Sequence, residues 1–247
     1  MTPEELIART AGPVGQHGAA YYFTPETLAT GKEMGLDGFR FYFLGRGGVL
    51  GDVEAPVVAS AFGYFEPSLV QRIWDSGRQV VAPRTAARAH LVCGHRFGRE
   101  RLAGAGDLAP FCAAAESVVA AADPAGLALF AGVAAEPLPE DPPARATQLL
   151  TVLRELRGST HLLAVVASGL SPKVAHYLGR PDYFGSFGWG DDDVPVVDDA
   201  RRATYGAVGA LTDRLLVPAY RALDEAASAD LADGVAAIAA ALAVSDG

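Results

Sequence analysis

The stretch VVASAFGYFEPSLVQRI, residues 57–73, decides the fold because it has the pattern of two helices joined by a tight turn. Apolar residues recur at helical spacing on both sides of Gly63, and Glu66-Pro67 begins the second helix, since proline is favoured at the first helical position. The stretch LLAVVASGLSPKVAHYL, residues 162–178, matches it without a gap. The sequence therefore predicts two helix-turn-helix hairpins related by an internal repeat.

Outside the two hairpins, other residue patterns also indicate the starts of helices. Thr2-Pro3 and Thr24-Pro25 each pair a capping residue with a proline at the first helical position. We expect further helices over residues 3–22, 25–34, 39–44, 83–102, 108–122, 146–156, 200–227 and 231–244. The fold class expected is mainly all-α, with two tandem helix-turn-helix or winged-helix-like modules and additional C-terminal helices.

The best candidate for a linker is AAEPLPEDPPAR, residues 134–145, which holds four prolines and three acidic residues. It divides the chain into an N-terminal winged-helix-like module, residues 1–133, and a C-terminal helix-turn-helix-like module with closing helices, residues 146–247. The acidic and glycine-rich stretch 179–199 is expected to be an irregular loop.

Composition narrows the class of protein and its partners. Apolar runs are shorter than the roughly 20 residues of a membrane span, and the acidic start lacks the order of a signal peptide, which favours a cytoplasmic protein without a membrane partner. The net charge is −9 and Lys32 and Lys173 are the only lysines. Because nucleic-acid binding usually requires a basic face, we expect nucleic acid to be an unlikely partner. The apolar C-terminal helices leave a homodimer open.

No catalytic or metal-binding motif of high specificity occurs. Cys93 and Cys112 are far apart and lack the spacing of a zinc site, so we interpret them as reduced packing residues. The sequence predicts no metal site and identifies no cofactor. A metal ion or haem held by histidine remains a minor alternative, and whether the protein is an enzyme stays open.

Four segments resemble an actinobacterial helix-turn-helix-like family that includes the SalK-type proteins of natural-product gene clusters. They are His17 with YYFTPE (21–26), GLDGF and its continuation (35–51), AFGYFEP (61–67) and LRELRGSTH (153–161). The resemblance implies two modules of winged-helix ancestry and a place in bacterial specialised metabolism, but no assigned reaction. The chain departs from the family pattern after Trp189, where an acidic loop stands in place of a further helix and wing.

Aromatic residues and a few isolated polar ones are the candidates for a site. Ten of the 21 aromatic residues are concentrated in the first 65 positions, and buried tyrosines need polar partners, which suggests a cavity with polar inner features. Arginine can clamp a carboxylate or phosphate, and histidine titrates near neutral pH. The tentative acid/base residues are His17 and His161. The ligand-binding candidates are Tyr21, Tyr22, Phe39, Tyr42, Arg46, Tyr64, Phe65, Arg154 and Trp189.

These candidates favour a small-molecule-binding protein or a cofactor-independent enzyme, with a pocket between the two helical halves. Aromatic residues would form its walls and Arg46 would anchor an anion. The ligand would be a small organic molecule, either neutral or anionic. The alternative is a transcriptional regulator, in which Gln71 and Arg72, or Lys173, His176 and Arg180, would contact DNA from the second helix of a hairpin. A purely structural dimer is the third reading.

Overall fold

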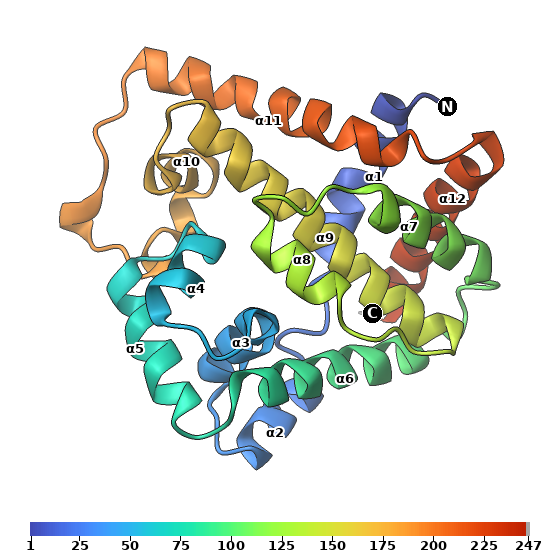
Figure 1. Cartoon of the computed structure of the whole chain (residues 1–247), viewed down its shortest axis with the longest axis horizontal. Coiled ribbons are helices and arrows are strands. Elements are labelled where there is room, and N and C mark those ends of the chain that lie inside the picture. Colours follow the sequence, from blue (N-terminus) through green and yellow to red (C-terminus); the bar gives the residue numbers. More distant parts are fainter. Residues whose placement is uncertain (246–247) are drawn as a thin grey trace.

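A computed structural model describes residues 1–245 of the chain, with side chains to residue 243 (Figure 1). The described part is helical throughout and contains no strand, so the expected all-α class is confirmed and no wing is seen. The helices are α1 (Pro3–His17), α2 (Pro25–Glu33), α3 (Gly38–Gly47), α4 (Ala55–Phe62), α5 (Pro67–Arg78), α6 (Pro83–Arg101), α7 (Ala109–Ala121), α8 (Ala128–Ala134), α9 (Pro142–Ala167), α10 (Pro172–Gly179), α11 (Asp199–Tyr220) and α12 (Glu225–Ser245). Short 3-10 turns are η1 (Gly48–Leu50), η2 (Pro181–Tyr183), η3 (Gly185–Phe187) and η4 (Asp191–Asp193).

The helix starts follow the cap-and-proline signals of the sequence. Thr2 and Thr24 cap α1 and α2, and Ser171 caps α10, each through its side-chain oxygen with proline next in the chain. Such caps satisfy backbone N–H groups that have no partner inside the helix. The local chemistry of these positions therefore suffices to place where the helices begin.

The helices differ from the expectation in several places. α11 ends at Tyr220 instead of residue 227, and α12 begins at Glu225 instead of residue 231. α1 ends at His17, and residues 18–23 form turns. α8 was not expected, because seven residues carry too little periodicity to be recognised. α9 runs unbroken for 26 residues and includes Pro142–Arg145, which the sequence placed in the linker. Gly158 suggested a break, but burial of both flanks of α9 overrides that weak propensity.

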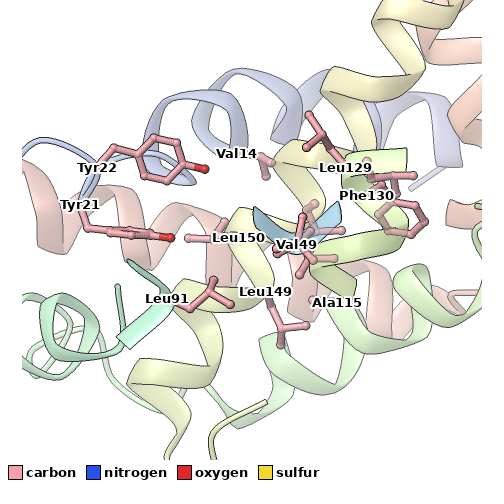
Figure 2. Close-up of a cluster of buried hydrophobic side chains, with 14 of the residues drawn as sticks. Val14, Tyr21, Tyr22, Val49, Leu91, Ala115, Leu129, Phe130, Leu149 and Leu150 are labelled. Atoms are coloured by element: carbon pink, nitrogen blue, oxygen red, sulfur yellow. The ribbon is translucent and has the colours of Figure 1, made fainter. Parts of the chain in front are cut away.

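α9 is the central element of the molecule (Figure 1). α1, α6, α7, α8 and α11 all pack against it. Figure 2 shows part of the resulting core, in which Leu149 and Leu150 of α9 meet Val14 of α1, Leu91 of α6 and Phe130 of α8. This core is continuous from α1 to α12, and the division into two modules with a linker stays a prediction.

The two predicted hairpins are both formed. In the first, α4 ends at Gly63, which has a φ of 75°, and α5 begins at Pro67. In the second, α9 is followed by Gly169, with a φ of 76°, and α10 begins at Pro172. Left-handed backbone of this kind favours glycine, which is why a glycine stands in each turn. Their common origin by duplication remains a prediction.

α12 is the one described helix that is long and apolar enough to cross a membrane by composition, over Glu225–Ala243. A third of that window is buried in the protein, and Leu231, Val235 and Ile238 belong to the main core. Helices of this kind are common in the cores of soluble proteins, so its composition is weak evidence for a membrane span.

Candidate functional site

A cleft of about 830 Å³ lies between the first hairpin with α1 and α3 on one side and α9, α10 and α11 on the other. Its volume falls within the range of clefts that hold small organic ligands. The turn between α4 and α5 contributes Tyr64 and Phe65 to the lining, and α10 contributes His176. The cleft is therefore bordered by both hairpins, although no single stretch of sequence supplies it.

Glycines, which have no side chain, help to keep the cleft open. Gly12 and Gly15 of α1 and Gly158 of α9 all line it, and a Cβ added at any of the three would have no atom within 4 Å. A glycine inside a helix costs roughly 0.5–1 kcal/mol relative to alanine. Three such positions around one cleft lower the stability of their helices and leave space for an occupant.

The lining is basic although the protein is acidic. Four arginines line the cleft, namely Arg46, Arg154, Arg157 and Arg180, and no aspartate, glutamate or lysine does. The whole chain carries a net charge of −9. Charges of one sign in a concave site concentrate the field there and attract the opposite ion. The cleft is consequently a positive site on a negative protein.

A buried carboxylate organises two of these arginines. Glu155, whose side chain is 3% exposed, accepts hydrogen bonds from Nε and Nη2 of Arg46, at 2.8 and 3.0 Å, and from Nη1 of Arg154, at 2.6 Å. Burial alone would raise the pKa of Glu155, but the two guanidinium groups outweigh it and lower the pKa. Two cations thus share one anion, which leaves one positive charge to be compensated.

The partners of each guanidinium show which arginine can reach a ligand. Arg46 directs two nitrogens at Glu155, and its guanidinium lies 4.6 Å from the centre of the Phe62 ring. Arg157 makes one longer contact, 3.4 Å from Nη2 to Asp213, and its buried Nε has no protein partner. Among the three arginines of α3 and α9, the most available donors therefore belong to Arg157 and to the second Nη of Arg154.

Unpartnered polar atoms gather at the same cleft. Across the described residues, five buried side-chain nitrogen or oxygen atoms lack a hydrogen-bond partner, and three of them belong to lining residues: the Tyr64 hydroxyl, Arg157 Nε and His176 Nε2. Buried polar groups without partners are rare because desolvation without a hydrogen bond costs about 1–3 kcal/mol. The cleft therefore contains most of the unpartnered buried polar atoms of the described residues.

Two histidines in the lining remain neutral at neutral pH. Burial lowers the pKa of His161, and the nearby Arg157 lowers it further while Asp213 raises it. Burial also lowers the pKa of His176, against a backbone hydrogen bond with Tyr183. Neutral imidazoles can each accept one hydrogen bond, so they add acceptors to a site whose arginines supply only donors.

The structure brings together six of the residues predicted as site residues. Tyr42, Arg46, Tyr64, Phe65, Arg154 and His161 all line the cleft. Five others do not line it. Tyr21 and Tyr22 are buried around His90, and Phe39 is 40% exposed beside Tyr42. His17 lies at the end of α1, and Trp189 donates from Nε1 to the Tyr64 carbonyl at 2.9 Å. The functional roles of all these residues stay predictions.

Sequence reasoning did not select Arg157, His176 or the three glycines as ligand contacts. The sequence analysis offers His176 as a possible DNA contact on α10, yet it is 6% exposed and its ring lies against that of Phe187, 4.1 Å between ring centres. Gly158 gave no signal of a ligand contact in the sequence, because the expected helix ends at residue 156 and leaves this glycine outside it. No group of three or more potential metal ligands comes together within the described residues.

Comparison with known proteins places the chain by family. A family model described as a helix-turn-helix family matches residues 8–247, while no curated protein and no solved structure matches. This match corrects the expectation that nucleic acid is an unlikely partner, because helix-turn-helix proteins commonly bind DNA. The net charge was a poor guide, since a local surface and not the whole molecule meets DNA. With nearly its whole length matched, the chain belongs to this helix-turn-helix family.

Proposed function

We propose that the cleft binds a small organic anion with an apolar body. The observation that carries the proposal is the sharing of Glu155 by Arg46 and Arg154, which leaves a half-buried positive charge uncompensated. A buried charge without a partner is costly, and an anionic ligand would remove that cost. Phe62, Phe65 and Phe187 supply apolar walls for the rest of the ligand. The lining offers acid/base groups but supports no particular reaction.

Titration calorimetry with benzoate and with inorganic phosphate, at low salt, tests the proposal. We expect benzoate to bind and Arg157→Gln to weaken binding by about tenfold, the loss of a hydrogen bond to a charged group. Arg99→Gln is the matched control, because Arg99 pairs with Asp141 on the surface and does not line the cleft. Equal effects of the two substitutions, or no binding at millimolar benzoate, would refute the proposal.

A second experiment substitutes glycines at which a new side chain would meet no neighbouring atom. Gly158→Leu should fill the cleft and abolish benzoate binding without lowering stability, because its Cβ meets no atom within 4 Å. Gly209→Leu is the control, since Gly209 of α11 has the same open surroundings and lies outside the lining. If both variants bind benzoate as the native protein does, the ligand site is elsewhere.

The family supports a second candidate function, that of a transcriptional regulator. On α5 the exposed Gln71 and Arg72 point away from the core and are free to meet DNA. The turn before α5 is also a wall of the cleft, through Tyr64 and Phe65. A ligand in the cleft would thus contact the same turn that positions α5, which links ligand binding to DNA binding.

Fluorescence anisotropy with duplex DNA fragments distinguishes this candidate. A regulator should bind with an affinity that falls as salt rises, and Arg72→Gln should reduce both the affinity and the salt dependence. Benzoate that saturates the cleft should then shift the DNA affinity. Affinity that is insensitive to Arg72 would exclude α5 as the DNA-contacting helix.

A further inference from the structure

The feature that carries a further inference is His161 on α9, one turn after Arg157. Its Nδ1 lies 3.0 Å from Oγ1 of Thr212 on α11, and that hydroxyl lies 2.9 Å from the carbonyl oxygen of Val208. Thr212 is fully buried, so no solvent competes for its hydroxyl. The ring of His161 lines the cleft.

This chain of contacts favours one position for the proton of the imidazole. The Thr212 hydroxyl has a single proton, and we assign it to the Val208 carbonyl oxygen, which can only accept a hydrogen bond. Thr212 then accepts from His161, which requires the proton to be on Nδ1. A neutral imidazole with Nδ1–H has a bare Nε2. Nε2 has no protein partner in the described structure and is therefore a hydrogen-bond acceptor at the cleft.

The charged and titratable groups facing His161 favour this neutral form. Arg157 is on its own helix, Asp213 comes from α11, and the Tyr64 ring from the first hairpin lies 6.5 Å away between ring centres. Arg157 disfavours a second positive charge and Asp213 favours one, while burial also disfavours it. The result is an acceptor beside a cationic donor on the same face of α9.

We infer that the cleft recognises a hydroxylated aromatic acid, whose acid group binds Arg157 and whose hydroxyl donates to Nε2 of His161. The inference rests on the proposed function and names the class of ligand. Side chains four residues apart on a helix are about 5–6 Å apart at Cβ, which suits an acid and a hydroxyl separated by one benzene ring. The aromatic walls enclose the ring, and Thr212 is a positioning residue.

Calorimetry with three probes tests the inference: 4-hydroxybenzoate, 4-methoxybenzoate and benzoate. We expect 4-hydroxybenzoate to bind about tenfold more tightly than either of the others, the worth of one hydrogen bond in a desolvated site. 4-Methoxybenzoate keeps an oxygen at the same position but has no proton to donate. His161→Phe should abolish the preference for 4-hydroxybenzoate over the other two probes. Equal affinities for the three probes in the native protein would overturn the inference.

Nitrogen NMR of the histidine side chains provides a readout that needs no ligand. At pH 8 His161 should show a protonated Nδ1 and a bare Nε2, and Thr212→Val should change this to a mixture of the two neutral forms. Thr212→Ser should keep the native pattern, because serine retains the hydroxyl. A protonated Nε2 in the native protein would refute the inference while leaving anion binding intact. Failure of all three probes to bind would instead refute the proposed function.

Discussion

The two helix-turn-helix hairpins have the same local design and are used differently. In the first, Trp74 and Val70 of α5 are fully buried in the main core, and Gln71 and Arg72 face solvent. In the second, α10 belongs to a small separate cluster around Leu170, and its His176 is buried against the cleft.

The difference arises from the surroundings of α5 and α10, the second helices of the two hairpins. The segment of 3-10 turns after α10 folds back, and Lys173 of α10 pairs with Asp193 at 2.8 Å. The same segment reaches the first hairpin, where the Glu66 N–H donates to the Phe187 carbonyl oxygen at 2.9 Å. The comparison teaches that a shared hairpin sequence does not imply a shared role. α5 keeps an exposed outer face that carries Gln71 and Arg72, whereas α10 turns His176 toward the cleft and pairs its Lys173 with Asp193.

The largest expected effect is the loss of stability when a side chain is removed from the main core or from the small cluster around Leu170. Trp74→Ala should lower the free energy of unfolding by about 3–5 kcal/mol, because it removes a fully buried ring and its hydrogen bond to the Val53 carbonyl. Leu170→Ala in the small cluster should cost about 2 kcal/mol, since fewer neighbours lose contacts. Urea unfolding measures both. Equal losses would contradict the view that only the first hairpin is anchored in the main core.

The next effect tests the link between the first half and α9. Glu155→Gln should cost about 3 kcal/mol of stability, because Arg46 and Arg154 lose their shared counter-ion inside the protein. Yet the same variant should bind benzoate more tightly, since a negative charge next to the cleft is gone. The control is Glu116→Gln, whose half-buried pair with Arg145 should be worth under about 1 kcal/mol. Loss of stability together with weaker benzoate binding would contradict the charge argument.

Lowering the pH should reduce the stability of the protein, because both halves contain buried neutral histidines. Burial among Tyr21, Tyr22 and Phe41 lowers the pKa of His90 from 6.5 to about 3. Below pH 6.5 the unfolded chain binds a proton that the folded one refuses, so stability should fall by about 1.4 kcal/mol for each pH unit toward pH 3.

Urea unfolding between pH 7 and 5 measures how the free energy of unfolding changes with pH. The variant His90→Leu should reduce that change. His176→Phe should also reduce the pH dependence of the unfolding free energy, because burial lowers the pKa of His176 as well. An unchanged slope in His90→Leu would show that other groups dominate the acid response.

The smallest effect compares the two turn glycines. Gly63→Ala and Gly169→Ala both place a Cβ at a φ near 75°, which costs roughly 1–2 kcal/mol. At Gly63 the new Cβ would also lie 2.5 Å from a methyl carbon of Leu162, while at Gly169 it would meet nothing within 4 Å. We expect about 2 kcal/mol at Gly63 and about 1 kcal/mol at Gly169, as differences in unfolding free energy. The reverse order would show that the two turns are not packed as described.

The helices themselves could be predicted because their signals are local. Pro67 and Pro172 each follow a capping residue and begin a helix in the structure. The prediction failed at Gly158, where the sequence suggested a helix end and the structure has the middle of α9. A glycine lowers helix propensity by only about 1 kcal/mol, and packing against several neighbouring helices exceeds that.

The site was predictable only in part. Arg46 and His161, which the sequence analysis predicts as site residues, line the cleft, whereas Tyr21 and Tyr22, predicted alongside them, are buried elsewhere. The function of all four stays a prediction. Nothing local separates a tyrosine that packs on His90 from one that lines a cleft.

By itself the sequence determined the all-α class, the two hairpins and the helix starts, since these depend on interactions between residues a few positions apart. Only the tertiary structure decided that Glu155 lies between Arg46 and Arg154, and that Thr212 holds His161. Arg46 and Glu155 are 109 positions apart in the chain, and His161 and Thr212 are 51 apart. The charge and hydrogen-bonding pattern of the cleft arises from such pairs, which join side chains of α3 and α11 to α9.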